Sequence, residues 1–332
     1  MCQYSAKGGV PNDWHLVHLG SRAVGGAALV LTEATAVSPE GRISPADLGI
    51  WSDEQVNAFK RITSFIREHG AVPGIQLAHA GRKASTKIPW IGDGMVPESE
   101  GGWQVIAPSA VKFSDTYPQP REMTKSDIAT VVRQWSEAAR RSLEAGFQVA
   151  EIHMAHGYLL HQFLSPLSNQ RKDEYGGELK NRMRFPLEVA KAVRSEWPES
   201  LPVFVRISVT DWVEGGWDLA QSVELAKELK KAGIDLIDSS TGGLVPGAKI
   251  PIAPGYQVKF ADEIRKQTGI MTGAIGMITG AAQAENILVT GQADVVFMAR
   301  EFLRDPYFPL HAAKSLGDDP EYPKQYMRAK PR

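Results

Sequence analysis

The sequence predicts a (β/α)8 barrel, and three observations lead to this fold class. Apolar segments of strand length alternate with amphipathic segments of helical length along the 332 residues. Segments that are apolar on both faces are typical of parallel strands, which are joined by crossover helices. Polar side chains recur where these segments end, as expected where the loops of a barrel meet on one face. A doubly wound sheet is the structural alternative, but no GxGxxG motif follows any predicted strand.

The predicted elements alternate in regular order. Strands are expected at 27–34, 72–79, 147–153, 202–208, 234–240, 270–276 and 293–299. Helices are expected near 13–25, 53–69, 125–145, 180–197, 219–232, 257–268, 280–290 and 302–314. The helix at 125–145 has signals at both ends, because Thr124 can cap its N-terminus and Gly146 suits the left-handed residue after its end. The long segments 81–122 and 209–220 are interpreted as lid or substrate loops.

The composition restricts the kind of protein. Lys and Arg number 37 and Asp and Glu 38, so the net charge of −1 disfavours nucleic acid and anionic membranes as partners. With one cysteine, Cys2, the chain can form no internal disulfide and no cysteine-based metal cage. No apolar run is long enough to span a membrane, and no signal-peptide pattern opens the chain. These observations predict a cytoplasmic protein that forms one domain over 1–332.

An eighth strand is not apparent in the sequence. The chain begins with MCQYSA, which reads as the loop that follows a first barrel strand. We therefore expect the first strand of the barrel to be missing from the chain, which would leave a sheet with two unpaired edges.

The stretch HMAHGY, at the end of the predicted strand 147–153, holds the main chemical candidates, His153, His156 and Tyr158. A His-x-x-His pair could be half of a zinc site, but no third ligand stands at a usual spacing. Alternatively, both imidazoles donate to one substrate oxygen and stabilise the negative charge that develops on it. Tyr158 could then donate a proton. This combination suits a reaction that forms an enolate and then protonates it.

An anion site is predicted at the carboxyl ends of the last strands. Gly243 and Gly276 lie in glycine-rich turns that end strands, and Arg300 follows the last predicted strand. Backbone N–H groups in such turns bind phosphate, and the loops after the seventh and eighth strands are the usual phosphate site of a barrel. The phosphate could belong to a substrate or to a cofactor.

Long motifs in this chain resemble those of the old yellow enzyme family. They are HMAHGYLLHQFLSPLSNQRKDEYGGELKNRMRF at 153–185, GIQLAHAGRKA at 74–84, LTEATAVSPEGR at 31–42, LGIWSDEQ at 48–55, TGAIGMIT at 272–279 and AREFLRDP at 299–306. The resemblance spans essentially the whole chain. The motifs look most similar to those of the branch of bacterial xenobiotic reductases and thermostable ene-reductases. The resemblance implies a single TIM-barrel domain that binds FMN without a covalent link.

The resemblance also implies roles for individual residues. His153 and His156 match the pair that binds the carbonyl or nitro oxygen of the substrate, and Tyr158 matches the proton donor. Cys2 matches a cysteine that tunes the flavin potential, and Tyr4 matches a tyrosine that contacts the substrate. Residues that bind FMN are implied at Met1, Cys2, Ala34, Gln76, Arg206, Gly242, Gly243, Gly276 and Arg300.

The activity that the resemblance implies is FMN-dependent reduction of activated alkenes. NADPH or NADH would reduce FMN, and an enone, nitroalkene or maleimide would then take hydride in a ping-pong order. Arg328 resembles an arginine that reaches the site of a neighbouring subunit, so a homodimer or homotetramer is expected. A chain without the first strand is expected to bind FMN weakly.

Two alternatives of another class stay open. One is a flavin-free, phosphate-binding barrel enzyme, which is disfavoured because Glu33 is the only carboxylate at a predicted strand end. The other is a truncated, non-catalytic paralogue that keeps the motifs but holds no FMN.

Overall fold

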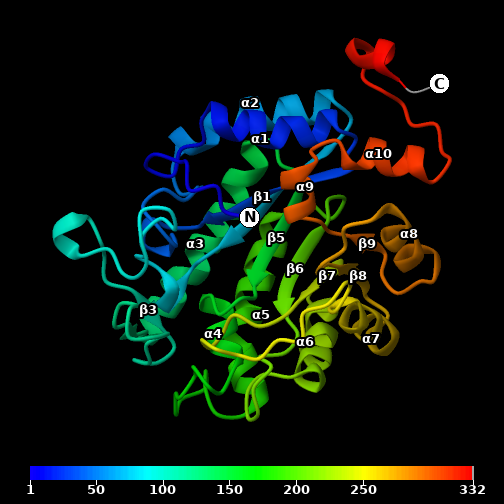
Figure 1. Cartoon of the computed structure of the whole chain (residues 1–332). Coiled ribbons are helices and arrows are strands. Elements are labelled where there is room, and N and C mark those ends of the chain that lie inside the picture. The colour runs from blue at the N-terminus through cyan, green and yellow to red at the C-terminus, as the bar shows by residue number, and fades with distance from the viewer. Residues whose placement is uncertain (331–332) are drawn as a thin grey trace.

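The computed structural model describes residues 1–330, and its central feature is one curled sheet of seven strands (Figure 1). In spatial order the strands are β1 (Leu29–Ala36), β2 (Val72–Ala78), β5 (Val149–Met154), β6 (Val203–Ser208), β7 (Leu236–Ser240), β8 (Met271–Ala274) and β9 (Val295–Val296). Every neighbouring pair is parallel. All seven predicted strands are therefore confirmed, with ends displaced by a few residues.

The sheet is open along one side. β1 and β9 are the two ends of the strand order, and within residues 1–330 no strand joins them. The barrel prediction is thus confirmed as a curled parallel α/β sheet, whereas closure into eight strands is not observed among the described residues. The expectation of a missing first strand stays a prediction.

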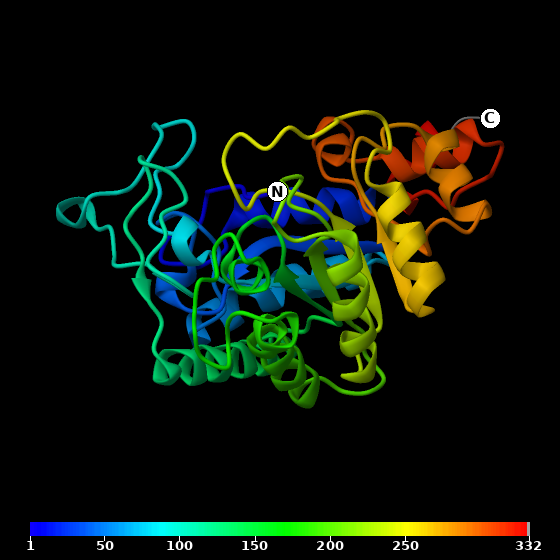
Figure 2. The same ribbon diagram turned by 90° about the horizontal axis from the view of Figure 1, so that it is seen from below.

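Helices cover the outer face of the sheet (Figure 2). They are α1 (Asp13–Val24), α2 (Asp53–Glu68), α3 (Lys125–Glu144), α5 (Leu179–Glu196), α6 (Leu219–Lys231), α7 (Val258–Thr268), α8 (Ala281–Val289), α9 (Arg300–Arg304) and α10 (Phe308–Ser315). From α1 to α7 each of these helices contacts the next, as expected for crossover connections of one hand. No helix of the described residues is long and apolar enough to cross a membrane.

Two helix predictions need correction. The helix expected at 302–314 is in fact two short helices, α9 and α10, because Pro306 cannot continue the hydrogen-bond ladder between them. The prediction also missed α4 (Leu159–Leu164), which begins directly after the His-Tyr motif. Its six residues are all buried, so no amphipathic period marks it in the sequence.

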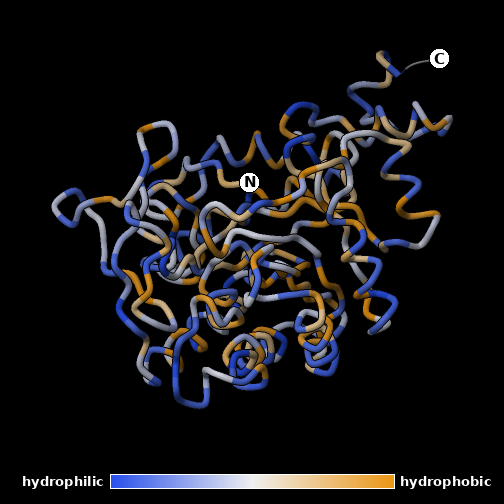
Figure 3. Tube along the Cα trace, turned by 60° about the horizontal axis from the view of Figure 1, so that its bottom comes forward, coloured by the Kyte–Doolittle hydropathy of each residue, from blue (hydrophilic) through white to orange (hydrophobic). Residues whose placement is uncertain are grey.

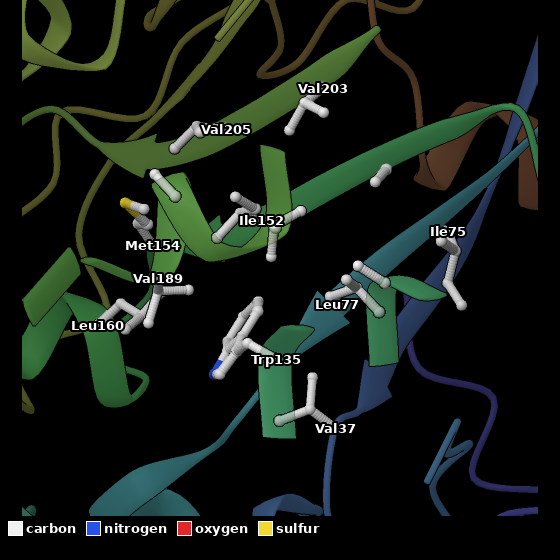
Figure 4. Packing of buried hydrophobic residues seen from close by; sticks show 14 of the residues in the cluster. Val37, Ile75, Leu77, Trp135, Ile152, Met154, Leu160, Val189, Val203 and Val205 are labelled. Carbon is white, nitrogen blue, oxygen red and sulfur yellow. The ribbon is translucent and has the colours of Figure 1, made fainter. Parts of the chain in front are cut away.

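The main hydrophobic core lies between the sheet and helices α1 to α7. Trp135 on α3 is fully buried and lies close to Leu77 of β2 and Val37 (Figure 4). Along the chain trace, hydrophobic residues are concentrated in the interior segments and hydrophilic residues in the outer turns (Figure 3). The predicted cap of α3 is confirmed, because the Thr124 hydroxyl accepts from the Asp127 N–H. Gly146 follows with φ of +89°, as predicted.

The segment 81–122 projects from the body and contains little regular structure (Figure 2). Its short elements are η2 (Gly81–Lys83), η3 (Glu98–Glu100) and the two-residue strands β3 (Ile106–Ala107) and β4 (Arg121–Glu122). β3 and β4 pair in parallel, so this part of the segment is not a hairpin. The remaining short helices are η1 (Pro39–Gly41) and η4 (Lys324–Ala329).

Candidate active site

The exit of β5 brings the three main candidates together. His153 is the penultimate residue of β5, His156 lies in the following turn, and Tyr158 is the N-cap of α4. The ring of His153 stands edge-on to both neighbours, 5.1 Å from the centre of His156 and 5.1 Å from the centre of Tyr158. The clustering expected from the sequence is therefore present.

Burial sets the protonation of this cluster. Desolvation is the main cause, and the nearby Arg206 charge the second, that holds the pKa of both His153 and His156 well below the usual value of 6.5. Both rings are thus neutral, and each carries one N–H. The Ala155 N–H donates to Nδ1 of His153 at 3.3 Å, which leaves the proton of His153 on Nε2. The ring of His156 is oriented through Nε2, which lies 2.7 Å from the Ser240 hydroxyl.

Tyr158 is held in its protonated form. Burial raises the pKa of its phenol well above 10, and the nearby Cys2 and Tyr4 add to that effect. A phenol that keeps its proton can act as a general acid toward a strongly basic carbon.

A cluster of charged side chains lies inside the sheet next to the histidines. Gln76 on β2 donates to Glu151 on β5 at 2.6 Å, and Arg206 on β6 pairs with Asp238 on β7 at 3.3 Å. His153 and Arg206 are register partners in adjacent strands. Burial raises the pKa of Glu151 to about 7, and the charge of Asp238 contributes. Within the described residues, Glu151 Oε2 and both oxygens of Asp238 accept no hydrogen bond, since the contact of Arg206 with Asp238 is an ion pair without hydrogen-bond geometry.

A cavity of about 450 Å³ opens between β1 and β9 and reaches this cluster. Met1, Gln76, Glu151, Arg206 and Asp238 line it together with apolar side chains of β1 and the segment 295–299. Its volume lies within the range of cofactor pockets, and its polar groups are few and convergent. Gln76 and Arg206, two of the residues predicted to bind FMN, therefore stand where a flavin ring would find a donor amide and a cation. The buried polar atoms without partners fit a polar ligand at this place.

The N-terminal segment supplies a second group of predicted residues. Burial and the charges of Asp47 and Glu33 raise the pKa of the Cys2 thiol, so the thiol stays protonated. Tyr4 lies beside Cys2 and has a φ of +48°. The centre of its ring lies 5.7 Å from that of the exposed Trp90. Tyr4 and Trp90 thus bring the N-terminus and the segment 81–122 together near the site.

The predicted phosphate residues lie in the turns after β7 and β8 and at the start of α9. Gly242, Gly243 and Gly276 all have positive φ, of +73°, +87° and +114°, and so form turns that favour glycine. Arg300 at the start of α9 is exposed, and its guanidinium lies 3.4 Å from the sulfur of Met277, next to Gly276. Ala34 is buried within β1.

Arg328 lies apart from this group. It stands on η4, whose segment extends away from the sheet at the C-terminal end (Figure 1). It is exposed and makes no side-chain hydrogen bond or ion pair within residues 1–330.

Sequence reasoning missed three charged residues of this region. Glu151 and Asp238 carry a visible signal, because each is an acid in the middle of an apolar strand. Lys83 follows β2 within the GRKA motif, and its ammonium donates to the backbone of two loops of the site. A lysine after a strand is a weaker signal, because most such lysines are solvated.

Known proteins are similar to this chain over nearly its whole length. Residues 1–319 match the model of the NADH:flavin oxidoreductase / NADH oxidase family. An NADPH dehydrogenase of Geobacillus sp. (strain WCH70) is 50% identical over 99% of this chain and 92% of the relative. An NADPH dehydrogenase of Listeria innocua is also 50% identical, over 99% of this chain and 93% of the relative.

Two solved structures share the fold. A morphinone reductase in complex with tetrahydroNAD has a TM-score of 0.78 and 28% identity, over 98% of this chain and 87% of its own. A 2-naphthoyl-CoA reductase complex has a TM-score of 0.86 and 26% identity, over 96% of this chain and 49% of its own.

Proposed function

Because the chain belongs to the NADH:flavin oxidoreductase / NADH oxidase family, in which FMN and NAD(P)H are the cofactors, we propose that it reduces activated C=C bonds. The substrate class is enones, nitroalkenes and maleimides. The single observation that carries this choice is the cluster of His153, His156 and Tyr158, which combines two neutral N–H donors with a protonated phenol.

The two imidazoles bind the electron-withdrawing group. The N–H of His153 lies on Nε2, and His156 donates from Nδ1 when its Nε2 accepts from the Ser240 hydroxyl. Neutral donors avoid the cost of burying a second cation beside Arg206. Negative charge grows on that oxygen during reduction, so the two donors bind it more strongly in the transition state than in the ground state.

Tyr158 supplies the proton. Its phenol is buried and protonated, and its ring lies 5.1 Å from that of His153. A substrate whose oxygen is held by the histidines therefore has an acid close to its α-carbon. FMN, when bound, supplies the hydride, and Gln76, Arg206 and the glycine turns would hold it.

The remaining assignments belong to the same proposal. NADPH or NADH would reduce the flavin before the alkene enters, which gives a ping-pong order. Cys2 would lie near the flavin, and Tyr4 would contact the substrate. Arg328, which is exposed on η4, would complete the site of a neighbouring copy in a homodimer or homotetramer.

The test is an absorption spectrum of the purified protein during two anaerobic additions. Flavin absorbance should bleach with NADPH and return with 2-cyclohexenone. A His153→Ala, His156→Ala double variant should still bleach with NADPH but should lose the second step. A protein that is reduced by NADPH and ignores the enone would refute the substrate class, and a protein that binds no FMN would favour the non-catalytic alternative.

A further inference from the structure

The turn after β5 touches the turn after β7 through backbone atoms. A Cβ on Gly157 would lie 2.2 Å from the Gly243 carbonyl oxygen, and a Cβ on Gly243 would lie 2.7 Å from Cα of His156. Both distances are far below a normal contact, so only glycine fits at these two positions. The substrate turn (155–158) and the glycine turn (241–244) are therefore in direct backbone contact.

Lys83 joins these two turns. Its ammonium donates to the carbonyl oxygen of His156 at 2.9 Å and to that of Gly243 at 3.0 Å. Two carbonyl dipoles that point at one place repel each other unless a cation or donor lies between them. The ammonium also lies 4.5 Å from the ring centre of Phe113 and 5.1 Å from that of Tyr158, within the range of cation–π contacts.

The geometry of His156 depends on outside contacts. Its φ is +58°, a left-handed conformation that a residue with a side chain adopts only when its surroundings enforce it. Its N–H donates to the Ser208 hydroxyl at 2.9 Å, and its ring is bonded to Ser240 at 2.7 Å. The third contact is made by the carbonyl oxygen of His156, which accepts a hydrogen bond from the Lys83 ammonium.

The protonation of Lys83 is compatible with this contact. Burial, together with the adjacent Arg82 charge, lowers the pKa of Lys83 to about 8, so the amine is mostly protonated at neutral pH. Arg82 contacts the same region, because it donates to the Leu244 carbonyl at 2.7 Å. The η2 turn thus presents two consecutive cations to the backbone of the glycine turn.

We propose that Lys83 is a positioning residue that fastens the substrate turn to the glycine turn and so sets the position of His156 and Tyr158 relative to the cofactor. This inference rests on the proposed function for its catalytic consequence, but the link between the two turns can be measured separately. Lys83 acts through His156 and the Tyr158 ring and takes no part in hydride or proton transfer.

The experiment compares wild type with Lys83→Met, Lys83→Arg and Lys87→Met, each loaded with FMN at saturating concentration. Lys87 lies four residues on and makes no side-chain hydrogen bond or ion pair among the described residues, so it is the matched control. Amide hydrogen exchange is followed by mass spectrometry for peptides that cover 155–158 and 241–244. The rate of flavin reoxidation by 2-cyclohexenone and the rate of reduction by NADPH are measured on the same samples.

Lys83→Met should speed amide exchange in both turns and lower the enone step by about 100-fold, because a shift of about 1 Å in a positioning group costs that much. Reduction by NADPH should change far less. Lys83→Arg retains a charge with several donors and should recover part of the loss, and Lys87→Met should match wild type.

The remaining outcomes test the link between the turns, the positioning role and the substrate class separately. Unchanged exchange in the two turns of Lys83→Met would overturn the proposal whatever the activity. Faster exchange with undiminished enone turnover would overturn the positioning role. Faster exchange in a protein whose wild type ignores enones would support the link between the turns and refute the proposed substrate class instead.

Discussion

The two ends of the curled sheet are built differently. β1 and β2 are eight and seven residues long, whereas β8 and β9 have four and two. Helices α1, α2 and α3 begin with capping boxes, whereas α7 to α10 have no side-chain cap. α8 and α10 bury one residue each and α9 buries none, while α3 buries six.

The predicted site residues are divided between these two ends of the sheet. Gln76, His153 and Arg206 stand on the long, well-covered strands, so their positions are set by the main core. Gly276 and Arg300 belong to the sparsely packed end, where little apolar surface holds the backbone. The residues predicted to act on the substrate or the flavin ring thus lie on the well-packed end, and Gly276 and Arg300, which are predicted to bind phosphate, lie on the sparsely packed end.

The largest expected effect tests the core directly. Ile75→Ala in β2 should lower the free energy of unfolding by about 3–5 kcal/mol, because Ile75 is fully buried in the main cluster. Ile287→Ala in α8 should cost about 2 kcal/mol or less, since its cluster is small and can collapse. Urea unfolding of both variants measures the difference. Equal losses would show that the two ends are equally well packed.

The second prediction concerns the charges inside the rigid end. The pKa of Glu151 is raised from 4.5 to about 7, so the folded state binds more protons than the unfolded state between these values. This group therefore lowers the free energy of unfolding as pH rises from about 4.5 to about 7, by about 3 kcal/mol at most.

Replacing Glu151 by Gln should flatten that part of the pH profile of the FMN-free protein. The measurement is urea unfolding at several pH values, with the exposed Glu100→Gln as control. Glu33 and Asp47, whose pKa values are raised by burial to about 7 and about 6, contribute a slope of the same sign. His153 and His156, whose pKa is lowered by burial, contribute a slope of the opposite sign, so the effect of Glu151 is the difference between the profiles of wild type and variant. A profile unchanged by Glu151→Gln would mean that this carboxyl titrates normally.

Arg300→Met should separate cofactor binding from folding. The side chain is exposed, so the free energy of unfolding without FMN should change by no more than about 0.5 kcal/mol. A charged hydrogen bond to phosphate is worth about 1.5–3 kcal/mol, so the Kd for FMN should rise by about 10- to 100-fold. Fluorescence titration of FMN gives the Kd, and an unchanged value would remove Arg300 from the phosphate site.

The smallest effects come from the helix starts. Thr124→Ala removes the cap of α3 and should cost about 1 kcal/mol. Gly280 begins α8 without a side-chain cap and has open space where a Cβ would lie, so Gly280→Ser should add a few tenths of a kcal/mol. Thermal unfolding of the two variants would show shifts of opposite sign. Destabilisation by Gly280→Ser would indicate that α8 has its start elsewhere.

The sequence by itself determined the order and type of the main elements. Apolar runs, helical periods, Thr124 and Gly146 are local signals, because hydrophobic spacing and capping act between residues close in the chain. The motif around His153, His156 and Tyr158 was recognisable for the same reason, since all three lie within six residues.

Only the tertiary structure decided how distant residues meet. The pairs Gln76–Glu151 and Arg206–Asp238, and the contact of Lys83 with His156 and Gly243, join residues tens of positions apart in the chain. Such contacts follow from strand order and register, which a local pattern does not contain. The position of the opening between β1 and β9 also follows from this strand order. The division of 300–315 into two helices differs, because Pro306 is a local signal that is already present in the sequence.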